Sequence, residues 1–191
     1  MKKKLFFAGM LAAALIFGMV LLGCPNDTTE ENDTWSDITG LDQMDGTWKG
    51  SYSQTMPIRE AVEQEGEEWS SEIGAFFGDM KVTVSVEVTT TLNAEAGTQT
   101  MEMKITETFS GGNIDTAWPM ISGASSSQSG VEIDNSKHSI TMYNSSEETI
   151  SDEDIAEMLG QDLQINQNGT KVKIPAGAMG SGLPEMTLVK Q

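Results

Sequence analysis

Alternation of apolar and polar residues is the strongest pattern in this chain. In residues 81–92 the even positions are apolar, including Val82, Val84, Val86 and Val88, and in residues 98–109 the odd positions Met101, Met103, Ile105 and Phe109 are apolar. A period of two is typical of a strand with one face on a core and the other in water. Residues 93–97 have the composition of a hairpin loop, so the two segments predict an antiparallel pair.

Shorter segments with strand character precede and follow this pair. They predict strands at residues 47–55, 131–134, 139–143, 163–167, 170–174 and 185–190. Asn168-Gly169, between two of them, is the strongest short hairpin signal. Eight strands within residues 43–191 predict one all-β, mainly antiparallel domain with up-and-down strand order.

Two other segments predict helices. Apolar residues recur at helical spacing in residues 57–77, so we expect a helical insertion after the first strand, which Gly66 can split. Ser151 followed by three acidic residues predicts the start of a short helix before the sixth strand, with Gly160 at its end. Residues 111–130, rich in serine and glycine, predict a mobile loop.

The N-terminus has the order of a secretory signal. Three lysines at positions 2–4 precede an uncharged apolar stretch at residues 5–22, and a small residue, Gly23, follows. An uncleaved signal anchor is the alternative, because eighteen apolar residues can span a bilayer. Residues 24–42 are mostly polar and acidic with no period, and they predict a disordered tether.

Leu21-Leu22-Gly23-Cys24 resembles the lipobox of bacterial lipoproteins. The resemblance implies that residues 1–23 are a signal peptide, and that Cys24 carries a diacylglycerol and an acylated amino group. Several acyl chains bind a membrane firmly where one binds marginally. The expected location is the cell envelope, anchored to a bacterial membrane and facing the periplasm or the exterior.

Residues 45–52, with Gly46 and Trp48 as a Gly-x-Trp motif, resemble the opening strand of lipocalin-like bacterial lipoproteins. The resemblance implies an eight-stranded up-and-down barrel in which Trp48 packs across one closed end. In that family a late basic residue often stacks on this tryptophan, and Lys190 stands at a matching place. The alternative is an ordinary core tryptophan in another antiparallel β domain.

Charge and residue counts exclude several functions. With 29 acidic and 11 basic residues the net charge is −18, which repels nucleic acid; a cationic partner or divalent cations remain alternatives. Cys24 is the only cysteine, so no disulfide is predicted. His138 is the only histidine and is expected at the surface, so no zinc site is predicted. The chain lacks a Gly-x-Ser-x-Gly motif and an EF-hand loop, so we expect no enzyme, no metal and no cofactor.

The leading functional hypothesis is a membrane-anchored, non-enzymatic protein that binds a small hydrophobic ligand inside its barrel. The expected interior is lined by Val82, Val84, Val86, Val88, Met101, Met103 and Ile105, with Trp69, Phe76 and Phe77 in a helical lid. An eight-stranded barrel is either filled by side chains or holds one small ligand. The alternative is a solid barrel whose loops bind a protein partner, suggested by Trp118-Pro119-Met120-Ile121 in the expected loop.

Overall fold

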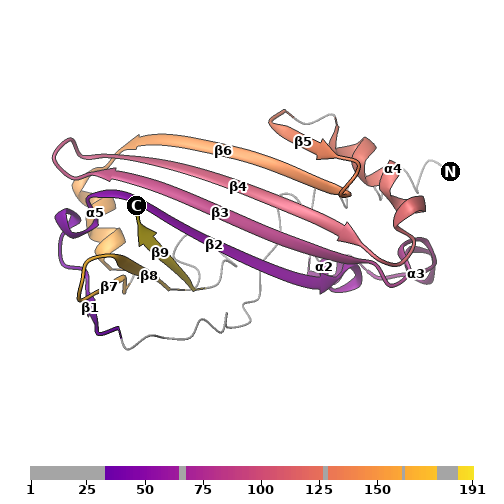
Figure 1. Cartoon of the computed structure of the whole chain (residues 1–191), viewed down its shortest axis with the longest axis horizontal. Coiled ribbons are helices and arrows are strands. Elements are labelled where there is room, and N and C mark those ends of the chain that lie inside the picture. The colour runs from indigo at the N-terminus through magenta and orange to yellow at the C-terminus, as the bar shows by residue number, and fades with distance from the viewer. Residues whose placement is uncertain (1–32, 65–67, 127–128, 161, 176–184) are drawn as a thin grey trace. The chain divides into compact units, whose positions relative to one another are not determined.

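The computed structural model describes residues 33–64, 68–126, 129–160, 162–175 and 185–191. Within these ranges nine strands form one sheet, in the order β1-β7-β8-β9-β2-β3-β4-β6-β5 (Figure 1). The strands are β1 (Trp35–Asp37), β2 (Gly46–Pro57), β3 (Lys81–Asn93), β4 (Thr98–Ser110), β5 (Val131–Asp134), β6 (Ser139–Thr149), β7 (Gln164–Asn166), β8 (Lys171–Ile174) and β9 (Met186–Lys190). The helices are α2 (Ile58–Gln64), α3 (Ser71–Phe77), α4 (Ile114–Ser125) and α5 (Asp152–Leu159), with a 3-10 turn, η1, at Leu41–Met44.

The predicted all-β, mainly antiparallel fold is confirmed. All eight predicted strands are present, and the predicted helical insertion is present as two helices, α2 and α3. The sheet is not closed, because the outermost strands of its order, β1 and β5, do not pair in the described part of the chain. The closed barrel expected from the sequence is therefore not what this sheet order gives. The predicted up-and-down order is also wrong at one place, because β6 and not β5 lies beside β4.

The chain divides into two compact units. Unit 1 contains Ser53–Val86 and Lys104–Tyr143, and unit 2 contains Glu87–Met103, Asn144–Gln191 and the described residues up to Tyr52. Strands β2, β3, β4 and β6 contribute one part to each unit.

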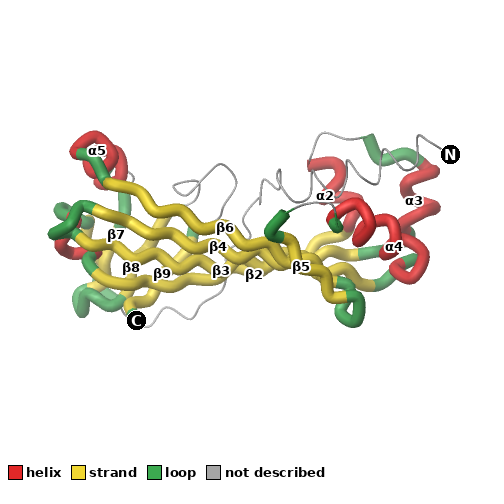
Figure 2. Tube along the Cα trace, turned by 90° about the horizontal axis from the view of Figure 1, so that it is seen from above, coloured by secondary structure: helices red, strands yellow, loops and turns green. Residues whose placement is uncertain are grey.

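Unit 1 has a core of sheet residues and helix residues. Helix α2 buries Ile58, Ala61 and Val62, whose spacing places them on one helix face. Ser70 caps α3 by accepting a hydrogen bond from the Ile73 amide, 3.2 Å away. Figure 2 shows the helices of this unit in red.

Helix α4 replaces the mobile loop expected at residues 111–130. Its buried side chains, Ala117, Trp118, Ile121 and Ser125, lie one turn apart and form one face. Packing of this face stabilises a helix whose serine and glycine content alone is unfavourable. Trp118 is only 6% exposed, which removes the exposed aromatic cluster on which the protein-partner hypothesis rested.

Unit 2 is built around β7, β8 and β9, which Figure 2 shows side by side. Strand β1 pairs with β7, and Lys171 of β8 forms an ion pair with Asp33 at 2.8 Å. The prediction of a disordered tether through residue 42 is therefore wrong from residue 33 onward, while residues 24–32 lie outside the described ranges. A three-residue strand carries too little alternation to be recognised in sequence.

The predicted cap at the start of α5 is confirmed. The Ser151 amide and hydroxyl both donate to the Asp154 carboxylate, and the Asp154 amide donates to the Ser151 hydroxyl. The hydrogen bond from the Ser151 hydroxyl is the main cause that lowers the pKa of Asp154. This reciprocal pair fixes the chain direction between β6 and β7.

Candidate functional site

Backbone pairing in unit 1 brings apolar side chains of three strands into one row. The Phe109 amide of β4 donates to the His138 carbonyl at 3.0 Å, and the Thr106 and Thr141 hydroxyls lie 3.1 Å apart. This register places Ile105 opposite Met142, and β5 places Val131 opposite the same methionine. Val131, Met142 and Ile105 therefore form a row across β5, β6 and β4 on one face of the sheet.

These side chains, with Ile133, form what we call the β5 patch. All four members, Ile105, Val131, Ile133 and Met142, are part-exposed. On the same face Ile140 and Phe109 are fully buried, and Val82, Val84 and Val86 of β3 are at most 2% exposed. The apolar face is thus covered at β3 and accessible at β5 and β6.

A buried carboxyl group adjoins the β5 patch. The register that pairs Ile105 with Met142 places Glu107 opposite Ile140, and Glu107 is only 1% exposed. Both of its carboxylate oxygens are inaccessible to solvent. Glu107 is therefore a buried neighbour of the β5 patch, and its carboxylate is closed to a ligand that lies on the patch.

Glu107 is the residue that our sequence reasoning missed. It occupies an odd position of β4, between Ile105 and Phe109, and therefore shares their face. The predicted inward positions of residues 98–109 were Met101, Met103, Ile105 and Phe109, without Glu107. A glutamate at an inward-facing strand position could have identified this residue in the sequence, because a carboxyl group is rarely buried and its burial destabilises the fold.

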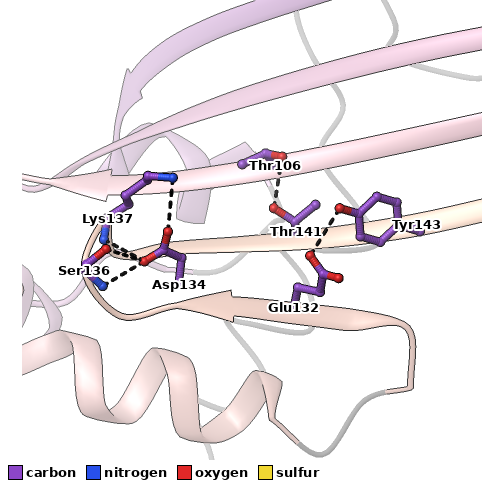
Figure 3. A network of polar contacts seen from close by, with 7 residues as sticks. All are labelled: Thr106, Glu132, Asp134, Ser136, Lys137, Thr141 and Tyr143. Carbon is purple, nitrogen blue, oxygen red and sulfur yellow. Dashed lines mark hydrogen bonds and ion pairs between the residues drawn. The ribbon is translucent and has the colours of Figure 1, made fainter.

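The opposite face of the same strands carries a polar network (Figure 3). The Tyr143 hydroxyl donates to the Glu132 carboxylate at 3.2 Å, and Asp134 accepts hydrogen bonds from the Ser136 hydroxyl and from the Ser136 and Lys137 amides. The Ser136 hydroxyl, and next Lys137, lower the pKa of Asp134 to about 2. These contacts hold β5 and its turn on β6, and so fix the position of the β5 patch.

The expected lining residues divide between the two units. Val82, Val84, Val86 and Ile105 lie in unit 1, and Val88, Met101 and Met103 lie in unit 2. The four valines are buried by the protein itself, whereas Met101, Met103 and Ile105 are part-exposed. Of the seven expected lining residues, only those on β4 retain surface that a ligand could touch.

The three aromatic residues expected in a lid form one cluster. The Phe76 and Phe77 rings meet edge to face at 4.9 Å, and the Trp69 and Phe77 ring centroids are 6.3 Å apart. Phe77 is buried, while Trp69 and Phe76 are part-exposed. The Asn113 amide group donates to the Ala75 and Phe76 carbonyls, so the end of α3 is fastened to the turn before α4.

Gly46, Trp48 and Lys190 meet in unit 2. The Lys190 amine lies 5.2 Å from the centre of the Trp48 ring, and the indole nitrogen donates to the Met44 carbonyl at 2.6 Å. Gly46 has a φ of 109°, and a Cβ at this position would lie 3.2 Å from the Lys190 side chain. The expected stacking of a late basic residue on Trp48 is present in this contact.

His138 is part-buried instead of lying freely at the surface. Its ring meets Trp118 at 5.2 Å, and the Trp118 indole nitrogen donates to the Asn135 side chain at 3.0 Å. These contacts join the β5–β6 turn to α4. Across the described ranges, no three histidine, cysteine or acidic side chains gather as a metal site requires.

Cys24 and the lipobox-like segment Leu21-Leu22-Gly23-Cys24 lie outside the described residues. Among the helices that the structure describes, none is long and apolar enough to cross a membrane. No protein-family model matches the chain, and no curated protein or solved structure matches it either.

Proposed function

We propose that this protein is a lipid-anchored, non-enzymatic, lipocalin-like protein of the bacterial cell envelope that binds a small apolar molecule on the β5 patch. The observation that carries the proposal is the register that aligns Val131, Met142 and Ile105 while leaving them part-exposed. Covering apolar surface contributes about 25 cal/mol per Å². A contiguous apolar surface of this kind marks an interaction site more often than scattered apolar residues do.

The chemistry of the β5 patch indicates the class of ligand. Met142 has a flexible side chain that adapts to ligands of different shape. Aliphatic side chains make up the rest of the β5 patch. We infer a ligand with an aliphatic body, such as an acyl chain.

The lipocalin-like assignment is supported by the pairing of β9 with β2 and by Trp48. The last strand, β9, pairs with the first long strand, β2, and this pairing sets Lys190 opposite Trp48. The assignment concerns the pairing of β9 with β2 and does not require that the sheet close into a barrel. Ligand binding on the β5 patch does not require a closed barrel either.

The lipid anchor is supported by the signal-like N-terminus and by Leu21-Leu22-Gly23-Cys24. Expression of the full chain in a bacterial host should place it in the membrane fraction, released only by detergent. Cys24→Ser should leave the protein free of acyl chains, as mass spectrometry of the N-terminal peptide would record. An acylated Cys24→Ser variant, or a wild-type chain without acyl groups, would contradict the anchor.

Ligand binding is tested on residues 33–191, which keep β1 and Asp33. We expect organic extracts to contain lipid, and a fluorescent fatty acid to bind saturably in a one-to-one ratio. Met142→Gln should weaken binding about tenfold, because it places an amide in the centre of the apolar row. The control is Val189→Gln, which makes a comparable change at a side chain that is 43% exposed in unit 2 and should leave binding unchanged. A clean extract without binding, or equal loss in both variants, would overturn the proposal.

A further inference from the structure

Within the part of the chain that the structure describes, strand β6 has an unpaired backbone edge over half of its length. Strand β5 pairs with β6 only at Ser139–Met142, at one end of β6 (Figure 1). Residues 144–149 have β4 on one side, and no strand of the described chain pairs with them on the other. Free strand edges are templates for the addition of another strand.

Three hydrogen bonds determine which backbone groups face this edge. The Tyr143 amide donates to Gly130, on the side of β5, at 3.3 Å. On the other side of β6, the His138 carbonyl accepts from Phe109 of β4, and the Ile150 amide donates to Gly97 at 2.8 Å. Because backbone groups alternate along a strand, the N–H and C=O groups of Ser145, Glu147 and Thr149 face the free edge.

The side chains at this edge are exposed and acidic. All six residues, Asn144, Ser145, Ser146, Glu147, Glu148 and Thr149, are exposed. Glu147 and Glu148 are adjacent, so one carboxylate lies on each face of the strand. An added strand would therefore meet negative charge on both of its faces.

We propose that the β6 edge, Asn144–Thr149, binds an extended basic segment of a partner protein as an additional strand. Backbone hydrogen bonds to Ser145, Glu147 and Thr149 hold the segment, and the two glutamates select for lysine or arginine. A second copy of this chain is disfavoured, since the chain carries a net charge of −18 and two edges would bring four glutamates together. This interaction is independent of the β5 patch.

The test measures fluorescence anisotropy with the full chain in non-ionic detergent. The probe is a short fluorescein-labelled threonine peptide with two adjacent lysines, one for each face. Ser145→Pro removes an N–H that faces the free edge and leaves the bonds to β4 in place, so it should weaken binding about tenfold or more. Ser145→Ala, the matched control, keeps this N–H and should bind as the wild type does.

Three further measurements separate strand addition from general attraction to an acidic protein. A peptide methylated at alternate backbone nitrogens should bind at least about tenfold more weakly, because it cannot donate those hydrogen bonds. A peptide with glutamate in place of lysine should bind wild type more weakly and prefer the Glu147→Lys/Glu148→Lys variant. On peptide binding, amide exchange should slow at Ser145, Glu147 and Thr149 and stay unchanged at Ser146 and Glu148.

The proposal fails if the lysine peptide does not bind the wild-type chain. It also fails if the peptide binds equally to Ser145→Pro and wild type, since the attraction would then be general and not directed to this edge. Amide exchange of β4 in the Ser145→Pro variant serves as the folding check: protection equal to wild type shows that the sheet is intact.

Discussion

Replacing Trp48 with alanine is expected to lower the free energy of unfolding by about 3–5 kcal/mol. Trp48 is completely buried, so its removal leaves a large cavity in unit 2. The substitution also leaves the Met44 carbonyl without its indole donor and the Lys190 amine without its aromatic ring. Urea unfolding followed by circular dichroism measures the loss.

Trp35→Ala is the matched control for this substitution. Lys173 lies over the Trp35 ring at 4.6 Å, much as Lys190 lies over Trp48, but Trp35 is part-exposed on the outermost strand. Trp35→Ala should lower the free energy of unfolding by about 1 kcal/mol, because less apolar surface is uncovered and solvent can fill the space. Equal losses for the two tryptophans would contradict a special role for Trp48 in the core.

Gly112→Ala is expected to destabilise the protein by at least about 2 kcal/mol, the sum of a backbone and a steric effect. Gly112 has a φ of 52°, which side-chain-bearing residues rarely adopt. A Cβ there would also lie 2.5 Å from the Met80 amide nitrogen and from the Phe77 carbonyl oxygen. The turn that joins β4 to α4 must then move away from α3, which thermal and urea unfolding would detect.

Gly169→Ala separates the two causes. Gly169 has a φ of 65°, close to that of Gly112, but an added Cβ would meet no atom within 4 Å. Gly169→Ala should therefore lower the free energy of unfolding by only about 1 kcal/mol, the strain of a side chain at positive φ. If both variants lose the same stability, the close approach of Gly112 to Met80 and Phe77 is not a constraint on the fold.

The sequence by itself determined most of the strands. Alternation in residues 81–92 and 98–109 is strong because each segment has one buried and one wet face, and the burial of β3 follows it residue by residue. The Ser151 cap and the hairpin at Gly169 were also predictable, since both depend on residues close in sequence.

Tertiary packing decided the elements that local sequence disfavours. Helix α4 forms in a segment rich in serine and glycine because its buried face packs in unit 1, and Trp118 is thereby withdrawn from the surface. Strand β1 exists because β7 offers it backbone partners, although its three residues carry no readable period.

The candidate site was predicted in part. Alternation alone assigned Ile105 correctly to the inward face, together with Val82, Val84 and Val86. Which of these side chains stay accessible depends on how many strands and helices cover them, and that is decided by contacts between residues distant in sequence. The burial of Glu107 opposite Ile140 has the same origin, because only the register of β4 against β6 brings the two positions together.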